Sequence, residues 1–367
     1  MPKTLPAKYF TDSRLFEREV ELFFGQRWVW AGRAEAIETP GSYLLREVAG
    51  ESVIVLRGAA GEVRGFYNVC RHRGSRMCTA AEGNLGRRIQ CPYHGWTYSL
   101  DGRLVAASHM GAKFERGEYP LHPVKTAVWD GHIFVHLGKR ATPLEQHLGR
   151  LHGKFAAWMM QDLRFYRRIV YEVQANWKLV IQNYSECLHC PLVHPALNRL
   201  TDYLGAENEA GGSTYFGGAM PFAPGAETMS MSGRRRRDYL PGLSGEQRAR
   251  VYYYAIIPNL LLSLQPDYML LHSLWPQAVD HTRIVCEWYF HPDEMAKPDF
   301  HADDAVEFWD TTNREDWRIV ELSQQGIQSR AYRPGPYSER EELLHAFDRM
   351  VMRAHAAANR VRARAAR

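Results

Sequence analysis

Long apolar runs are missing from this sequence, whose mean hydropathy is −0.42. A helix needs about 20 consecutive apolar residues to cross a bilayer, so we expect no membrane-spanning segment. Residues 1–5 do not begin the apolar stretch that a secretory signal peptide requires. We therefore expect a cytoplasmic protein.

Cysteine is also scarce, with six residues in a chain of 367. In the reducing compartment that we expect, these cysteines are not predicted to form disulfides. Nothing after residue 160 has the glycine fingerprint of a dinucleotide-binding loop, or a second set of closely spaced cysteines. We therefore do not expect the chain to contain a reductase domain of its own.

The net charge of +5 comes largely from clustered arginines, at residues 234–237 and 353–367. No nucleic-acid-binding motif accompanies them, so we interpret them as a solvated loop and an exposed end, and we predict no nucleic-acid partner. Residues 205–250 are rich in Gly and Met and are predicted to form a long mobile loop near a pocket.

The length of the chain exceeds what one hydrophobic core usually supports, so two domains are expected. Changes of composition divide the chain into four segments: a helical N-terminal segment (1–40) that packs on the larger domain, a small domain (41–155), a larger domain (156–355) and a basic tail predicted to be disordered (356–367).

Both domains show strand patterns that favour antiparallel sheets. The small domain has short apolar strands between turns, such as residues 52–57 and 132–137. In the larger domain, strands are predicted at 166–173, 251–257, 259–264, 268–275 and 282–290. One helix is predicted to begin with the apolar residues 177–181 and to end at Pro191, and another is predicted at 303–329. This order predicts an α+β fold: an antiparallel β domain, then an antiparallel sheet flanked by helices.

Two motifs in the small domain each combine one cysteine with one histidine: Cys70 with His72, and Cys91 with His94. Two thiolates for one iron and two imidazoles for the other are the ligands of a Rieske [2Fe–2S] centre. A structural Cys2His2 zinc site is the alternative, although C-x-H is shorter than the spacer that such sites favour. Four unconnected core residues are a further alternative. We assign Cys78 no role.

The larger domain carries His189 and His194 where Pro191 and Pro195 end the predicted helix. Two imidazoles from one element can bind one metal ion, and a carboxylate from elsewhere then completes the 2-His-1-carboxylate triad of a non-heme Fe(II) oxygenase. Taken alone, two nearby histidines are more often structural or exposed side chains than metal ligands.

Asp316 is the candidate for that carboxylate. It lies on a largely inward stripe of the predicted helix, formed by Phe308, Thr312, Asp316, Val320, Ser323 and Ile327. A carboxylate on such a stripe needs a partner, which is either a metal ion or a buried arginine. Glu315 is one residue away and remains the alternative ligand.

The order of these motifs resembles that of the Rieske non-heme iron oxygenases, specifically their terminal oxygenase (alpha) subunits, over nearly the whole chain. The resemblance implies two sets of ligands: Cys70, His72, Cys91 and His94 for a [2Fe–2S] cluster, and His189, His194 and Asp316 for a mononuclear Fe(II). It also implies O2 as co-substrate and a separate NAD(P)H-dependent reductase with flavin and iron–sulfur centres. A homotrimer, or a multiple of it, is implied because the cluster of one subunit serves the iron of the next.

Glu186 precedes the first iron histidine, where this family carries the carboxylate that bridges the two centres of neighbouring subunits. Ring-hydroxylating dioxygenases usually have Asp there. Glu186, with residues 183–187 and 310–317, resembles the branch that acts on quaternary ammonium compounds, which includes glycine betaine and carnitine monooxygenases. This likeness implies hydroxylation of an N-methyl group, giving demethylation and formaldehyde. The aromatic candidates for ammonium recognition are Tyr203, Phe216, Tyr252, Tyr254, Trp275 and Trp309.

Other functions share part of this pattern. An aromatic-ring-hydroxylating dioxygenase alpha subunit has the same metal ligands and differs in its pocket. A stand-alone Rieske electron carrier needs only the first domain, and a structural metal-binding module would lack acid-labile sulfide. The cationic residues near the predicted cluster, which are either solvated or a docking site for an acidic partner, are Arg71, Arg73, Arg87 and Arg88.

Overall fold

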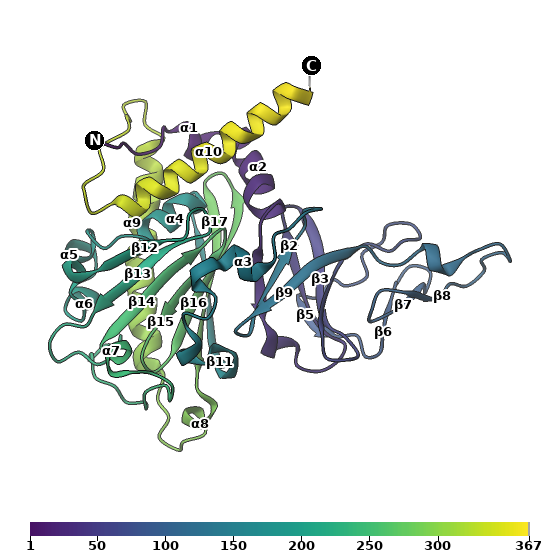
Figure 1. Cartoon of the computed structure of the whole chain (residues 1–367), viewed down its shortest axis with the longest axis horizontal. Helices are drawn as coiled ribbons and strands as arrows, with labels where there is room; N and C mark the ends of the chain where they lie inside the picture. Colours follow the sequence, from purple (N-terminus) through teal and green to yellow (C-terminus); the bar gives the residue numbers. More distant parts are fainter. Residues whose placement is uncertain (366–367) are drawn as a thin grey trace. The chain divides into compact units, whose positions relative to one another are not determined.

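Figure 1 shows the computed structural model of the chain, which describes residues 1–365. The chain forms two compact units: a larger one made of residues 1–22 and the part from residue 147 onward, and a smaller one made of residues 23–146. We expected residues 23–40 in the N-terminal segment. They belong instead to the smaller unit, because strand β1 (Val29–Arg33) pairs antiparallel with β10 (His132–His136).

The smaller unit contains a seven-stranded antiparallel sheet, in the order β1-β10-β9-β4-β3-β2-β5, and a three-stranded sheet, β6-β7-β8. Its remaining strands are β2 (Ser42–Val48), β3 (Glu51–Arg57), β4 (Val63–Tyr67), β5 (Glu82–Asn84), β6 (Arg88–Gln90), β7 (Thr97–Ser99), β8 (Leu104–Ala106) and β9 (Pro123–Trp129). These pairings confirm the predicted antiparallel β domain.

Tight hairpin turns set the register of this sheet. Ala49 and Gly50 connect β2 to β3 with φ angles of 50° and 81°, and Asp130 and Gly131 connect β9 to β10 with φ angles of 44° and 79°. Two-residue turns with both φ angles positive match the right-handed twist of the flanking strands. The chain can therefore reverse at these points without separating the strands.

The larger unit contains a second seven-stranded antiparallel sheet, in the order β11-β17-β16-β15-β14-β13-β12. Its strands are β11 (Arg164–Val173), β12 (Glu207–Ala210), β13 (Tyr215–Pro221), β14 (Arg250–Ile256), β15 (Leu260–Leu264), β16 (Met269–Ala278) and β17 (His281–Phe290). Its helices are α1 (Lys8–Thr11), α2 (Ser13–Glu19), α4 (Trp177–Tyr184), α5 (Cys190–Val193), α6 (Pro195–Asn198), α7 (Gly245–Arg248), α8 (Pro292–Met295), α9 (Asp303–Ile327) and α10 (Glu342–Ala365). Helix α3 (Leu144–Leu148) lies where the chain passes from one unit to the other.

Helices α4 and α9 pack on this sheet and on each other (Figure 1). From the sheet, His272 of β16 shares a hydrogen bond of 3.0 Å with Asn313 of α9, and its ring lies edge-on to that of Tyr184 in α4. The arrangement confirms the predicted α+β fold, in which an antiparallel sheet is flanked by helices. The two helices thereby hold their facing residues at fixed positions over the strands.

A buried ionic cluster attaches the N-terminal helices to this unit. The Glu19 carboxylate of α2 accepts hydrogen bonds from Lys178 Nζ of α4 at 2.5 Å and from His355 Nε2 of α10 at 3.1 Å. The side chains of Glu19 and Lys178 are fully buried, so each charge depends on the other for its solvation. The contact explains why residues 1–22 belong to the larger unit.

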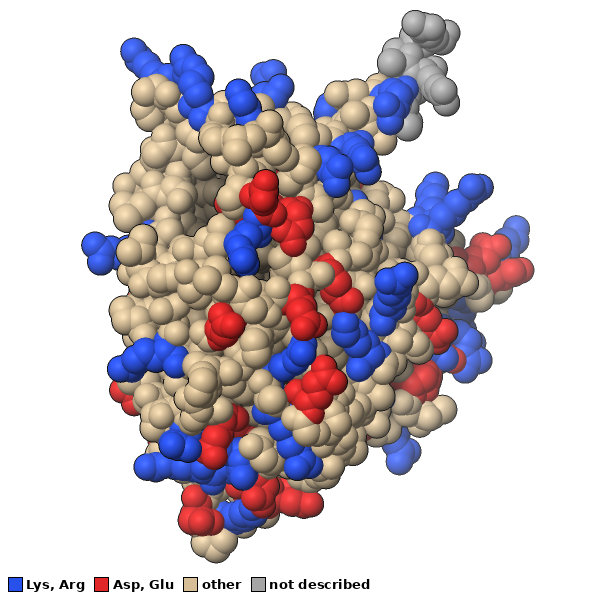
Figure 2. Space-filling view, turned by 60° about the vertical axis from the view of Figure 1, so that its left-hand side comes forward, with Lys and Arg blue, Asp and Glu red and all other residues tan. Residues whose placement is uncertain are grey.

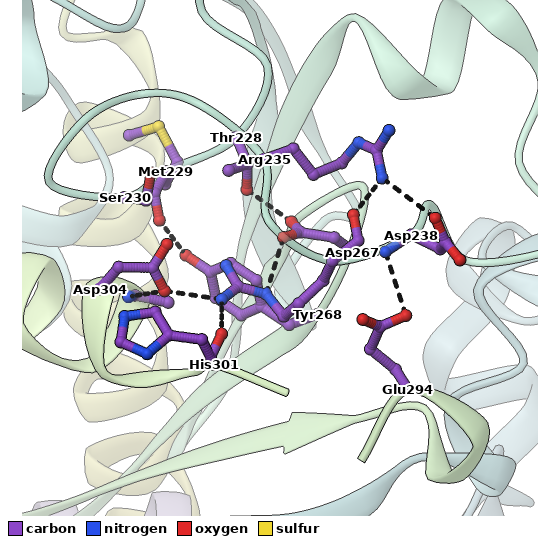
Figure 3. A network of polar contacts seen from close by, with 12 residues as sticks. Thr228, Met229, Ser230, Arg235, Asp238, Asp267, Tyr268, Glu294, His301 and Asp304 are labelled. Carbon is purple, nitrogen blue, oxygen red and sulfur yellow. Dashed lines mark hydrogen bonds and ion pairs between the residues drawn. The ribbon is translucent and has the colours of Figure 1, made fainter. Parts of the chain in front are cut away.

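Two expectations about the arginine-rich segments are wrong. Residues 205–250 are not one mobile loop, because β12, β13 and β14 take parts of them into the sheet and Arg237 is 1% exposed. Its guanidinium binds the carboxylates of Asp267 and Asp304, in the network of Figure 3. The tail is not disordered from residue 356, because α10 continues to Ala365; residues 366–367 lie outside the described part.

In the view of Figure 2, acidic and basic side chains are intermingled over the middle and lower part of the face, whereas the charged side chains along its upper edge are basic. Among residues 1–365, no helix combines the length and the apolar character needed to cross a bilayer.

Candidate metal centres

Two loops of the smaller unit present the predicted cluster ligands with the same backbone pattern. In the first, Cys70 N–H donates to Ser75 O, and Gly74 N–H donates back to Cys70 O. In the second, Cys91 N–H donates to Trp96 O, and Gly95 N–H donates to Cys91 O. Both glycines have positive φ angles, 76° and 69°, which residues with a side chain rarely adopt.

The four side chains of these loops converge. Cys70 and Cys91 are buried, and burial, followed by the nearby Cys91 thiol, raises the pKa of Cys70 against the lowering effect of Tyr98. The imidazoles of His72 and His94 are exposed, and their ring centroids lie 4.6 Å apart. His72 also stacks on Trp96, with an interplanar angle of 7°. Two buried thiols beneath two exposed imidazoles suit a cluster with one iron on each side.

The Tyr98 hydroxyl supports the first loop, and the sequence did not indicate it. It accepts a hydrogen bond from Arg71 N at 3.0 Å and lies 3.4 Å from Cys70 Sγ. Tyr98 belongs to the buried core beneath both loops, so the position of Cys70 is fixed by the core. In β7, Tyr98 stands between the polar residues Thr97 and Ser99, and this alternation is the sequence signal that favours a buried position for it.

The second candidate centre is assembled from α4, the turns that follow it and α9. His189 precedes α5, His194 lies between α5 and α6, and Asp316 comes from α9. Asp316 Oδ1 lies 2.8 Å from His194 Nε2 and 3.3 Å from His189 Nε2. One ligand atom from each residue lies within 4.8 Å of the others, which fits a single metal ion.

The charges of this triad are strongly coupled. Burial opposes ionisation of Asp316, but hydrogen bonds from both histidines lower its pKa to about 2. Burial likewise disfavours a charged His189, but Asp316 and Glu186 raise its pKa to about 10. The Asp316 carboxylate thus favours protonated imidazoles beside it. A divalent cation bound at the same point can replace these protons.

Each histidine also has a carboxylate on its other nitrogen. His189 Nδ1 lies 2.5 Å from Glu186 Oε1, and His194 Nδ1 lies 2.8 Å from Glu315 Oε2. Carboxylates in this position orient metal-binding imidazoles. Glu315 therefore lies behind His194, on the side of the ring away from Asp316. Asn183 was not predicted at the site, and its amide donates to Asp316 Oδ1 at 3.0 Å.

The expectation that the chain has no disulfide is wrong. Cys187 and Cys190 are paired, and their Cα atoms lie 5.0 Å apart. The prediction relied on the expected compartment, whereas the turn between α4 and α5 brings these two residues within disulfide range. Cys70, Cys78, Cys91 and Cys286 are free.

A cavity of about 100 Å³ adjoins the second centre. Its aromatic wall consists of Tyr184, Tyr253 and Trp309, with ring centroids 6.0 Å apart for the two tyrosines and 6.2 Å apart for Tyr253 and Trp309. Glu186, His189, His194 and Asp316 line the cavity as well. Of the six aromatic residues proposed from the sequence, Trp309 alone lines it.

Tyr253 was missed because of strand parity. Successive residues of a strand point to opposite faces, so choosing Tyr252 and Tyr254 meant choosing the wrong face of β14. Tyr254 is almost fully buried, and its hydroxyl donates to Glu209. Three consecutive tyrosines give no alternation from which the correct face can be read.

Comparison with known proteins identifies both units. Residues 27–126 match the Rieske [2Fe–2S] domain family, and residues 160–357 match the catalytic domain of ring-hydroxylating alpha subunits. The chain is 32% identical to the glycine betaine monooxygenase oxygenase subunit of Pseudomonas aeruginosa, over 93% of this chain and 86% of the relative. It is 29% identical to the carnitine monooxygenase oxygenase subunit of Escherichia coli, over 90% and 86%.

Solved structures agree with these matches. The quaternary ammonium Rieske monooxygenase CntA, in complex with L-carnitine, has a TM-score of 0.78 and 26% identity, covering 96% of this chain and 95% of that one. The matched family carries a Rieske cluster and a mononuclear iron and uses O2, which agrees with the two sets of side chains described above. The chain is therefore an oxidoreductase that belongs to the Rieske oxygenases, with the domain composition of their alpha subunits.

Proposed function

We propose that this chain hydroxylates an N-methyl group of a quaternary ammonium substrate, which leads to N-demethylation. The observation that carries the proposal is the aromatic wall of the cavity beside the triad. A methylated ammonium has no proton to donate, so aromatic faces and nearby carboxylates recognise it. Tyr184, Tyr253 and Trp309 supply the faces, and Glu186 supplies a carboxylate. The names of the betaine and carnitine relatives support the same substrate class.

The donor sets fit the cofactors of the family. When bound, the cluster supplies one-electron transfer, and the mononuclear iron supplies activation of O2. Cys70, His72, Cys91 and His94 are the residues that would hold the cluster. His189, His194 and Asp316 would hold the iron, with Glu186 and Glu315 orienting the two imidazoles.

The overall reaction is a monooxygenation. One atom of O2 enters a C–H bond of the N-methyl group, and the other is reduced to water with two electrons and two protons. In the resulting N-hydroxymethyl ammonium compound the hydroxyl group loses its proton to solvent and the C–N bond breaks with its electron pair on nitrogen. This releases formaldehyde and leaves the amine with one methyl group fewer. We infer that a separate NAD(P)H-dependent reductase, containing flavin and an iron–sulfur centre, supplies the electrons.

Glu186 is proposed as the bridge between neighbouring subunits. Its carboxylate accepts a hydrogen bond from His189 Nδ1, and its second oxygen accepts one from Leu188 N. His72 and His94 are both exposed in the smaller unit. We infer a homotrimer, or a multiple of it, in which one of these two histidines approaches Glu186 of the next subunit, so that the two side chains connect the centres.

A formaldehyde assay tests the proposal. The iron-loaded, chemically reduced protein is exposed to O2 with glycine betaine, carnitine, choline or a simple arene, and His189→Ala serves as the matched control. Formaldehyde in proportion to the electrons supplied, from one of the methylated ammonium compounds, is the expected result. A dihydrodiol from the arene without formaldehyde would instead make the chain a ring-hydroxylating dioxygenase.

A further inference from the structure

One wall of the cavity is held from behind by a buried tyrosine. Trp309 Nε1–H donates a hydrogen bond of 2.7 Å to the hydroxyl of Tyr268, which in turn donates one of 2.6 Å to the carbonyl of Met229. Tyr268 is fully buried and Trp309 is 5% exposed. The hydroxyl donates its proton to the Met229 carbonyl and accepts the Trp309 N–H on a lone pair, so both partners determine its orientation.

Buried hydrogen bonds and ion pairs hold the segment around Met229 in place. Next to Tyr268, the Asp267 carboxylate accepts hydrogen bonds from Thr228 at 2.5 Å and from Arg237 Nε at 3.0 Å (Figure 3). Arg237 Nη1 also binds Asp304, at 2.6 Å. Because Asp304 and Trp309 belong to the same helix, α9, the network attaches residues 228–237 to the element that carries the indole.

We propose that Tyr268 is a positioning residue for substrate recognition, whose hydroxyl holds the Trp309 indole in the cavity wall. Tyr268 is not among the residues that line the cavity and therefore acts through Trp309. The indole meets Tyr253 edge-on at 73°, so a turn of the indole changes the shape of the aromatic wall. This inference rests on the proposed function only in that the substrate contacts Trp309.

Tyr268→Phe tests the inference because it removes one oxygen atom and keeps the ring. The holoenzyme is assayed for KM, kcat and product formed per electron, on a methylated ammonium compound or, if the wild type oxidises only the arene, on the arene. The identity of the substrate that reacts tests the proposed function. The change in KM and in product per electron between wild type and Tyr268→Phe tests the role of Tyr268. Iron content and the cluster spectrum are recorded for every variant.

We expect a rise of about fivefold in KM and about half the product per electron, because an unsatisfied buried indole N–H turns toward another partner. The kcat value and both metal contents remain near those of the wild type. Trp309→Phe produces a similar defect, and Tyr268→Phe adds nothing to it, since a phenyl ring has no N–H to hold.

Tyr337→Phe is the matched control. Tyr337 is also buried and its hydroxyl donates to Asp348 at 2.7 Å, but neither Asp348 nor its other partner, Gln182, lines the cavity. It is expected to leave KM and product per electron unchanged. An unchanged KM in Tyr268→Phe, or a defect that adds fully to that of Trp309→Phe, would overturn the inference.

Discussion

Glu315 and Asp316 are consecutive in α9, yet their carboxylates meet opposite nitrogens of one imidazole. Glu315 Oε2 lies 2.8 Å from Nδ1 of His194, and Asp316 Oδ1 lies 2.8 Å from Nε2. A metal-binding histidine commonly donates its second N–H to a carboxylate, which fixes the ring and its tautomer. The geometry therefore separates the two neighbours into a candidate ligand, Asp316, and a residue that orients His194.

Asp316→Ala is expected to lose the mononuclear iron, because only two protein ligands remain. Glu315→Gln is expected to bind iron about 10-fold to 100-fold more weakly but to reach full occupancy at high iron concentration. Anaerobic iron titration, with acid-labile sulfide as the internal standard for the cluster, distinguishes the two. An equal loss of iron from both variants would show that the assignment is wrong.

Glu186→Gln is expected to bind iron more weakly, as Glu315→Gln does, but to hold both metals when iron is supplied in excess. It is nevertheless expected to lose turnover, because the amide keeps the size of the side chain but removes the charge between the two centres. His189→Ala is expected to lose the mononuclear iron while the visible spectrum of the cluster persists. Metal analysis and a single-turnover assay on both proteins check this pair. Normal turnover by Glu186→Gln would remove the bridging role.

Asp348 should make the larger unit less stable as the pH rises. Burial raises its pKa to about 6, despite hydrogen bonds from Tyr337 and Gln182 that lower it. Between its unfolded pKa, about 3.9, and about 6, the folded state binds more protons, so the free energy of unfolding decreases with pH, by up to about 3 kcal/mol.

Asp348→Asn removes this titration. Its carbonyl oxygen can still accept from Tyr337, and the Gln182 amide can turn its oxygen toward the new NH2 group. Urea unfolding of wild type and variant at several pH values should show a difference in stability that grows in favour of Asp348→Asn between pH 4 and pH 6. A constant difference over this window would mean that Asp348 does not titrate there.

Arg237→Met should destabilise the larger unit by about 3–5 kcal/mol, because it leaves the buried carboxylates of Asp267 and Asp304 without their cation. Arg234→Met, in the same arginine run, is the control. Arg234 has a 67% exposed side chain and is expected to change stability by less than about 0.5 kcal/mol. Thermal unfolding of the two variants should differ clearly, and similar melting temperatures would contradict a structural role for Arg237.

The candidate metal ligands could be predicted because their signals are local. The spacing of Cys70 and His72 favours a pair of cluster ligands over a zinc site, and Asp316 follows from helical periodicity. The aromatic wall could not be predicted, because three consecutive tyrosines do not show which face of β14 meets the cavity, and the pairing of β14 with β13 joins residues distant in sequence. The burial of Arg237 could not be predicted either. Its carboxylate partners lie 30 and 67 residues away in the sequence, so nothing near it distinguishes it from a solvated arginine.

Helix α9 carries both the candidate ligand Asp316 and the wall residue Trp309, seven positions apart and therefore on nearly the same face. Tyr253 comes from β14, which provides none of the three candidate ligands. A substitution at Tyr253 can therefore reshape the cavity wall while the positions of the three candidate ligands are kept. Changes at Trp309 are more constrained, since a shift of α9 that makes room for a different side chain also displaces Asp316.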